Sequence, residues 1–366
     1  MNIRAAILRD ASLKMPIEYA AIDEPRGDEV LVRIVAAGVC HTDVKVAMTP
    51  GLSPRPIVLG HEGAGIVEKT GAQVRKLRVG DPVVLTFGSC GRCPACIAGK
   101  PAYCYEVRAV CFGGTRIDGS TTLCCGADAV HGSFFSQSSF ATHAIANERN
   151  AIKVRADAPL EYLGPLGCGI QTGAGAVLNS LRVGAGASIA VFGAGAVGLS
   201  AVMAARIAGA SKIFAVDVID ARLEMAGELG ATHVIDARKS SALDEIMSVT
   251  GRGVDFSIDT SAVDSAIQQA IECVGPLGTC GLIANKNAAQ NAQVNILGAM
   301  LRGRTIRGIV QGDSVPDIFI PRLVDFFMDG AFPIDRLVTF YPFEDIERAM
   351  ADNDSGAAIK PVLRMS

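Results

Sequence analysis

The sequence has no tryptophan, and aromatic residues make up only 5% of its 366 positions, which excludes little by itself. Two other absences are more informative. There is no run of basic residues and the formal net charge is −3, so a nucleic-acid surface is not expected. No apolar stretch is long enough for a membrane span, and the first residues enter a predicted strand rather than a signal peptide. We expect a cytoplasmic protein without nucleic-acid or membrane partners.

The composition that is present is typical of a globular protein. Hydrophobic residues make up 49% and charged residues 19% of the chain, which is long enough for two domains with separate cores. Eleven cysteines are many for the cytoplasm, where disulfides are disfavoured. Clustered cysteines in this chain therefore suggest metal sites first.

A glycine-rich turn joins a predicted buried strand, 188–192, to a predicted helix, 199–208. Gly193, Gly195 and Gly198 have the G-x-G-x-x-G spacing. The first glycine allows the tight turn, the second lets the backbone approach a pyrophosphate, and the third permits close packing of the helix. The N–H groups at the start of the helix can then bind the phosphates. The turn predicts a dinucleotide site.

Asp217 follows the next predicted strand, 212–216, about 20 residues after Gly198. A carboxylate at this place is expected to bind the hydroxyls of the adenosine ribose, and its charge would oppose a 2′-phosphate. NAD is therefore favoured over NADP. The same G-x-G pattern also occurs at 63–65 and 184–186, but only the turn at 193–198 has the surrounding strands, helix and acidic residue.

Strands and helices alternate after Asp217, which predicts a doubly wound parallel sheet. The predicted helices are 220–229, 242–249 and 263–273, and the predicted strands are 233–235, 254–259 and 279–284. Beyond residue 308 we expect a helix at 318–328, a strand near 337–341, a helix at 343–351 and a strand at 359–363.

Four cysteines form the strongest local metal signal: Cys90, Cys93, Cys96 and Cys104. Four thiolates in one short lobe can close a tetrahedron around zinc and leave no position for a substrate, so this site would be structural. An iron–sulfur cluster and four unlinked buried thiols are the alternatives. The seven-residue gap before Cys104 and the adjacent dinucleotide unit argue against the cluster. Prolines and a glycine predict that the lobe is a loop without helix or strand.

The remaining cysteines and histidines have no ligand spacing, with one exception. We interpret Cys111, Cys124, Cys125, His131 and His143 as packing or loop residues. Cys168 differs because it lies between two glycines just before the dinucleotide unit.

Five motifs occur in the order found in the zinc-dependent medium-chain alcohol dehydrogenases, and the chain resembles that family over essentially its whole length. They are Cys40-His41-Thr42-Asp43, Gly60-His61-Glu62, the four-cysteine lobe, Gly167-Cys168-Gly169 and the turn at 193–198. Within the family the chain looks most like bacterial aryl-alcohol dehydrogenases. The stretches 133–140, 164–177 and 317–323 carry that likeness, much of which geraniol dehydrogenases share.

The resemblance implies two zinc ions, one catalytic and one structural in the four-cysteine lobe. Cys40, His61 and Cys168 would bind the catalytic zinc and leave its fourth position open, a ligand set that suits catalytic zinc. Asp43 and Glu62 would be carboxylates behind these ligands that orient and tune the site.

Further roles follow from the resemblance. Thr42 would receive the alcohol proton, while His41 and Lys360 would lie near the cofactor pyrophosphate. Thr172 would approach the nicotinamide, and Arg222 could pair with the adenosine ribose.

Of two further positions near the expected substrate site, one departs from the family pattern, and the other has a role that the pattern does not specify. Lys45 stands where family members with a complete proton relay have histidine, so the last proton step would use lysine or water. Phe87 is a candidate wall of the substrate pocket, although a plain core position fits it equally well.

The implied fold is a Rossmann dinucleotide domain, 170–308, inserted into a mostly β, GroES-like catalytic domain. That domain would comprise residues 1–169, with a zinc lobe at 88–105, and residues 309–366. The resemblance also implies a homotetramer or homodimer.

The implied activity is zinc-dependent oxidation of an aromatic primary alcohol, such as benzyl alcohol, to its aldehyde with NAD. Geraniol or another allylic terpene alcohol is the main alternative. Glutathione-dependent formaldehyde oxidation fits less well because no extra basic cluster is present. A non-catalytic NAD-binding protein would be expected to lack some of the zinc ligands.

Overall fold

The computed structural model describes residues 1–365, which form two compact units. The first unit contains Met1–Gly169 together with the chain from Val315 onward, and the second contains Ile170–Ser314. The second unit therefore ends at Ser314 rather than at residue 308. Among the described residues, no helix is both long and apolar enough to cross a bilayer.

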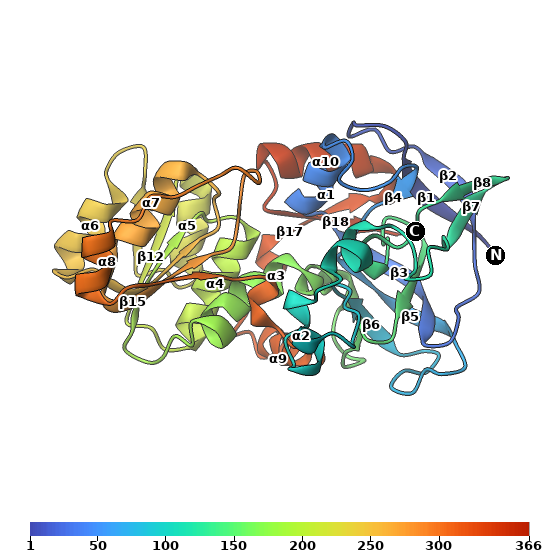
Figure 1. The fold of residues 1–366 in the computed structure, drawn as a ribbon, viewed down its shortest axis with the longest axis horizontal. Coiled ribbons are helices and arrows are strands. Elements are labelled where there is room, and N and C mark those ends of the chain that lie inside the picture. The colour runs from blue at the N-terminus through green and yellow to red at the C-terminus, as the bar shows by residue number, and fades with distance from the viewer. Residues whose placement is uncertain (366) are drawn as a thin grey trace. The chain divides into compact units, whose positions relative to one another are not determined.

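The second unit is built on a six-stranded parallel sheet in the order β13-β12-β11-β14-β15-β16. This is the strand order of a doubly wound Rossmann fold. The strands are β11 Ser188–Phe192, β12 Lys212–Asp217, β13 His233–Asp236, β14 Val254–Asp259, β15 Val274–Leu282 and β16 Thr305–Gly308. The helices are α3 Gly169–Gly175, α4 Ala196–Ile207, α5 Asp220–Leu229, α6 Ala242–Thr250, α7 Asp264–Glu272 and α8 Ile296–Arg302 (Figure 1).

The predicted α/β fold class is confirmed in this unit. The first central strand, β11, is buried along nearly its whole length, as expected for an apolar strand covered on both faces. The helix α5 ends at Gly230, whose φ of 125° lies in the region that favours glycine. Two elements were not predicted: α8, and the edge strand β16 that follows it.

The first unit contains two sheets, and one of them includes strands from both ends of the chain. One has the order β4-β1-β2-β7-β8, and the other has the order β10-β6-β5-β3-β18-β17, with β9 also paired to β3. Their bounds are β1 Asn2–Leu8, β2 Ile17–Ile22, β3 Glu29–Gly38, β4 Ile57–Val58, β5 Gly63–Thr70, β6 Pro82–Leu85, β7 Leu123–Cys125, β8 Asp128–Val130, β9 His143–Asn147, β10 Ala151–Lys153, β17 Val338–Pro342 and β18 Lys360–Arg364.

Helices of the first unit include α1 His41–Met48, α2 Pro94–Ile97, α9 Pro316–Met328 and α10 Ile346–Ser355. The expectation that the cysteine lobe is entirely loop is wrong, because α2 forms one turn there. Pro94 is its first residue, a position where proline costs no helical hydrogen bond. The last strand, β18, pairs antiparallel with β3 and thereby lies beside the segment that leads to α1 (Figure 1).

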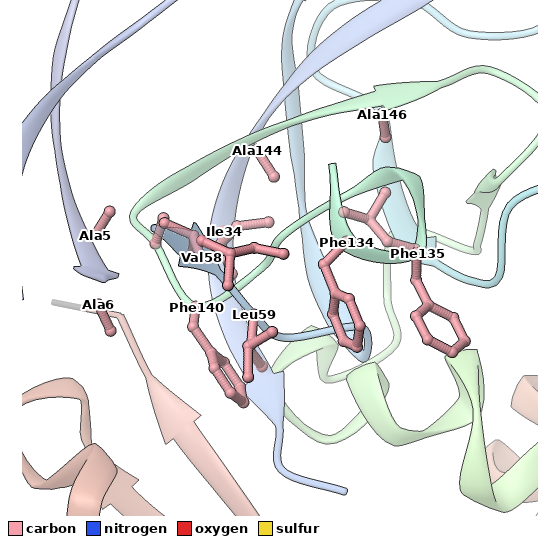
Figure 2. Close-up of a cluster of buried hydrophobic side chains, with 14 of the residues drawn as sticks. Ala5, Ala6, Ile34, Val58, Leu59, Phe134, Phe135, Phe140, Ala144 and Ala146 are labelled. Atoms are coloured by element: carbon pink, nitrogen blue, oxygen red, sulfur yellow. The ribbon is translucent and has the colours of Figure 1, made fainter. Parts of the chain in front are cut away.

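The hydrophobic core of the first unit includes a cluster of aromatic and aliphatic side chains next to β4. Phe134 and Phe140 are fully buried, and Phe135 is nearly so. Figure 2 shows Phe134 and Phe135 projecting from one segment toward the same side, with Leu59 and Phe140 nearby. This part of the core supports the functional side chains described next.

Candidate active site and zinc centres

Three segments of the first unit bring Cys40, His61 and Cys168 together. Cys40 is the residue that caps the N-terminus of α1, His61 lies between β4 and β5, and Cys168 ends a short 3₁₀ helix, Gly164–Gly167. Their ligand atoms and one carboxylate oxygen of Glu62 all lie within 4.8 Å of one another. The hydrogen bond with Cys168 and the charge of Lys360 lower the pKa of Cys40, which favours the thiolate that binds metal.

The imidazole of His61 is arranged as a metal ligand. It is fully buried, and its Nδ1 lies 2.9 Å from Asp43 Oδ1. Its Nε2 has no hydrogen-bond partner in the described structure, which would be costly in a buried ring unless a metal ion takes this place. Two thiols and this free nitrogen fit the Cys₂His set of a catalytic zinc.

Asp43 connects the first two ligand segments. Its Oδ2 accepts a hydrogen bond from Cys40 N at 3.0 Å, and its Oδ1 accepts one from Gly60 N at 3.1 Å. Burial disfavours the charged imidazole, but the Asp43 carboxylate raises the pKa of His61 well above its usual value. Asp43 therefore orients the ring and strengthens its basicity, as expected for a carboxylate behind a metal-ligating histidine.

Glu62 forms a buried ion pair with Lys360. The ammonium of Lys360 lies 3.1 Å and 3.0 Å from the two carboxylate oxygens of Glu62 and 3.1 Å from Val39 O. The expected role of Lys360 near the cofactor therefore has to be corrected, because only 2% of the residue is exposed and its donors bind Glu62 and Val39. Burial raises the pKa of Glu62 to about 7, although the charge of Lys360 opposes this shift.

Aromatic rings surround His61. The ring centroid of Phe135 lies 4.5 Å from that of His61, and the centroid of Phe134 lies 5.6 Å away at an interplanar angle of 86°. Phe112 packs edge-on against both phenylalanines. We call Phe112, Phe134 and Phe135 the aromatic cluster. It supplies an apolar environment beside the metal ligands.

The cysteine lobe forms a second group of four candidate ligands. The thiols of Cys90, Cys93, Cys96 and Cys104 lie within 4.8 Å of one another. Backbone N–H groups point at three of the sulfurs: Cys90 N at Cys104 Sγ, Cys93 N at Cys90 Sγ, and Tyr105 N at Cys93 Sγ. Such N–H groups stabilise thiolate charge, and they lower the pKa of Cys93 to about 6. A closed set of four thiols fits a structural zinc.

The glycine-rich turn of the second unit has the geometry of a phosphate-binding loop. Gly193 has a φ of 92°, and a Cβ on Gly198 would collide with the Gly193 carbonyl oxygen. A Cβ on Gly195 would meet nothing within 4 Å. The turn leads into α4, whose N-terminus has no side-chain cap. Its free N–H groups and open approach fit a pyrophosphate.

Asp217 ends β12 beside this turn. Its Oδ2 accepts a hydrogen bond from Ala194 N at 2.6 Å, and its Oδ1 accepts from Val218 N and Ile219 N. Arg222 lies in the first turn of α5, and Thr172 lies on α3 with its hydroxyl 3.4 Å from Gln311 Oε1. Of these three residues, Asp217 has a side chain that contacts the glycine-rich turn.

Three other expected residues of the first unit lie on α1, and Phe87 follows β6. His41 is exposed, and Thr42 and Lys45 are half-buried on that helix. Phe87 is 5% exposed and belongs to the core of the unit.

Sequence reasoning gave no site role to the aromatic cluster or to Gln137, which contacts the backbone of His61. The likeness of the stretch 133–140 to aryl-alcohol dehydrogenases was the available signal.

Family models match both units of the chain. The model described as alcohol dehydrogenase GroES-like domain matches residues 26–156, and that described as zinc-binding dehydrogenase matches residues 196–328.

Similar proteins cover nearly the whole chain. A geraniol dehydrogenase from Castellaniella defragrans is 46% identical over 99% of this chain and 98% of its own. The crystal structure of an alcohol dehydrogenase zinc-binding domain protein from Burkholderia ambifaria is 52% identical, with a TM-score of 0.99 over 100% of this chain and 99% of that chain. That of benzyl alcohol dehydrogenase from Acinetobacter calcoaceticus is 43% identical, with a TM-score of 0.96 over 100% of both chains.

Proposed function

Because the chain belongs to the zinc-dependent medium-chain alcohol dehydrogenases, we propose that it oxidises an aromatic primary alcohol to the aldehyde with NAD. The observation that carries the choice of substrate is the aromatic cluster, in which the rings of Phe135 and Phe134 lie 4.5 Å and 5.6 Å from the ring of His61. Flat π-systems pack well against such rings in offset or edge-to-face geometry. A benzyl-type alcohol would match this apolar environment.

The proposed ligands of the catalytic zinc are Cys40, His61 and Cys168, because two thiols and an unpartnered buried nitrogen converge there. When bound, zinc would supply a Lewis acid that lowers the pKa of an alcohol. Asp43 holds the His61 ring in place through Nδ1, at 2.9 Å. Thr42, in the first turn of α1, would accept the hydroxyl proton at Oγ1 and pass its own proton on to the cofactor ribose. The aromatic cluster would exclude water.

NAD would supply the hydride acceptor, and the second unit would hold it. The turn at Gly193, Gly195 and Gly198 would bind the pyrophosphate at the N-terminus of α4. Asp217 would accept hydrogen bonds from the adenosine ribose and oppose a 2′-phosphate, which favours NAD over NADP. Arg222 and Thr172 would contact the ribose and the nicotinamide side of the cofactor.

Geraniol is the second candidate substrate. The geraniol dehydrogenase from Castellaniella defragrans is 46% identical over 99% of this chain. Benzyl and allylic alcohols share an activated carbinol carbon next to a π-system, so the aromatic cluster suits both.

The proposed function is tested by measuring NAD reduction by the purified zinc-loaded protein with benzyl alcohol, geraniol and butanol. We expect the largest kcat/KM for benzyl alcohol. If kcat/KM were largest for geraniol, the second candidate would be favoured. If it were largest for butanol, the role of the aromatic cluster would be contradicted. With NADP in place of NAD, kcat/KM should be lower.

We also propose that two copies of the chain associate through β16 and α8. β16 is an edge strand, and α8 buries none of its residues. Ile296, Leu297, Met300 and Leu301 on α8 are 75%, 60%, 68% and 74% exposed. A second copy related by a two-fold axis would pair with the open strand edge and cover this apolar face. Stable interfaces cover roughly 800 Å² on each partner, which an edge strand with an apolar helix can supply.

A further inference from the structure

The segment Ser133–Phe140 has a backbone that needs support from its surroundings. Phe135, Ser136 and Ser138 have φ angles of 51°, 58° and 54°. Side chains other than glycine rarely adopt this left-handed conformation, and it persists where neighbouring contacts determine it. The segment runs beside the residues that precede the candidate ligand His61, since Ser139 N donates to Gly60 O and Phe140 N donates to Leu59 O.

The side-chain amide of Gln137 ties this segment to His61. It is fully buried, and its Nε2 donates to His61 O at 2.9 Å and to Thr86 O at 3.1 Å. Its Oε1 accepts a hydrogen bond from Gly63 N at 3.1 Å. His61 O and Gly63 N belong to the peptide groups on the two sides of Glu62. One amide therefore holds the backbone from which the His61 ring projects.

The same residue is linked to the other parts of the site. Thr86, which accepts from Gln137, donates through Oγ1 to Gly167 O at 2.7 Å, next to Cys168. Phe134 and Phe135 precede Gln137 in the strained segment, and their rings pack against His61. Gln137 thus connects the aromatic cluster with two of the segments that carry metal ligands.

We propose that Gln137 is a positioning residue that fixes Phe135 relative to His61 and thereby sets the preference for flat, unsaturated alcohols over saturated ones. This inference rests on the proposed function, because the preference is defined by that reaction. Gln137 makes no contact with substrate or metal in this scheme. It acts by holding the backbones of His61 and of the aromatic cluster in one arrangement.

The test is the variant Gln137→Met, which keeps the length of the side chain but removes all three hydrogen bonds. The ratio of kcat/KM for benzyl alcohol to that for butanol should fall about tenfold, since small displacements of a reacting pair have effects of this size or larger. The visible spectrum of the cobalt-substituted protein should also change, because it reports the geometry around the metal without relying on turnover.

Asn150→Leu is the matched control. Asn150 is also a buried amide, and its Nδ2 donates to the same acceptor, Thr86 O, and to Ser136 O. It makes no hydrogen bond to His61 or Gly63. Asn150→Leu should therefore lower the free energy of unfolding. If the hydrogen bond from Gln137 to His61 sets the substrate preference, this variant should keep the ratio of kcat/KM values within about twofold and leave the cobalt spectrum unchanged.

Two further variants keep the proposal falsifiable if Gln137→Met does not fold. Gln137→Glu retains an acceptor for Gly63 N and, when protonated, one donor, so it should give an intermediate ratio. Phe135→Leu should lower the ratio by itself, and Gln137→Glu should then cause no further decrease, because coupled residues are not additive. An additive decrease, or a Gln137 variant with an unchanged ratio and cobalt spectrum, would overturn the proposal.

The outcome for Gln137 can be separated from the outcome for the proposed function. If the unaltered protein oxidises neither benzyl alcohol nor geraniol, the proposed function fails. The cobalt spectra of Gln137→Met, Gln137→Glu and Asn150→Leu still decide whether Gln137 positions His61.

Discussion

The ammonium nitrogen of Lys360 lies 3.0 Å from Oε2 of Glu62, and both side chains are almost completely buried. Lys360 is the first residue of β18, near the end of the chain, and Glu62 follows the candidate metal ligand His61. Glu62 Oε1 also accepts a hydrogen bond from Gly169 N, next to Cys168, and Lys360 donates to Val39 O, next to Cys40. The ion pair therefore connects all three ligand segments.

Removing the lysine should be strongly destabilising. In Lys360→Met the side chain of Glu62 would be buried without its partner and would have to stay charged or take up a proton. Breaking a buried ion pair in this way typically costs about 3–5 kcal/mol of unfolding free energy. Urea denaturation of the zinc-loaded protein measures this loss. The double variant Glu62→Gln with Lys360→Met removes both charges and should recover part of the stability. A loss below about 1 kcal/mol in the single variant would show that the ion pair contributes little.

The parts of the molecule that could be predicted from the sequence are those whose residues lie close together along the chain. Ser188 to Asp217 form one strand, turn, helix and strand, and β11, β12 and α5 begin and end close to the predicted residues. The glycine spacing is informative because all three glycines are required by the backbone geometry of the same turn. The predicted thiol lobe is also local, since its four cysteines lie within one short segment.

The parts that could not be predicted depend on contacts between distant residues. Lys360 and Glu62 are 298 positions apart, and only the pairing of β18 with β3 places them together. The left-handed φ of Phe135 depends on neighbouring contacts such as those of Gln137, and no propensity of phenylalanine indicates it. The edge strand β16 was not predicted, because the apolar residues of α8 just before it cannot be distinguished from core residues by sequence alone.

Cys168→Ser should lose the catalytic metal while the fold remains. The variant replaces one of the proposed thiolate ligands by a hydroxyl that binds zinc poorly, so zinc content should fall from two ions to one and activity should be lost. Elemental analysis and circular dichroism measure the two properties. Cys111→Ser is the control, because Cys111 is also buried but its thiol donates to Gly88 O and belongs to neither group of candidate metal ligands. Unchanged activity in Cys168→Ser would remove Cys168 from the site.

Cys96→Ser should mainly affect stability. The lobe around Cys90, Cys93 and Cys104 depends on a closed ligand set, and structural zinc contributes directly to folding free energy. We expect a lower melting temperature and loss of one zinc ion, with activity per folded molecule retained at low temperature. A variant that is fully stable but inactive would contradict the structural assignment of this lobe.

Charged residues on α8 should separate the proposed dimer. Leu297 and Leu301 are 60% and 74% exposed, so Leu297→Glu with Leu301→Glu should not disturb the core of a single chain. Burying these carboxylates against a second copy would be unfavourable, because unpaired charges at an interface are costly. Analytical ultracentrifugation should show a shift toward a smaller species. Changing Tyr19 and Ile318 to glutamate is the control, because these residues are 74% and 71% exposed and lie outside α8. An equal shift in that variant would contradict the assignment to α8.

Asp217→Asn should narrow the preference for NAD over NADP. The carboxylate of Asp217 lies beside the glycine-rich turn, with Oδ2 2.6 Å from Ala194 N, where it would repel a 2′-phosphate. Loss of this charge should reduce the ratio of kcat/KM for NAD to that for NADP at least about tenfold, which corresponds to about 1.4 kcal/mol of discrimination. Asp220→Asn removes a nearby exposed carboxylate that pairs with Arg238, and it should leave the ratio unchanged. If both variants changed the ratio equally, the general charge of this region rather than contact with the ribose would explain cofactor choice.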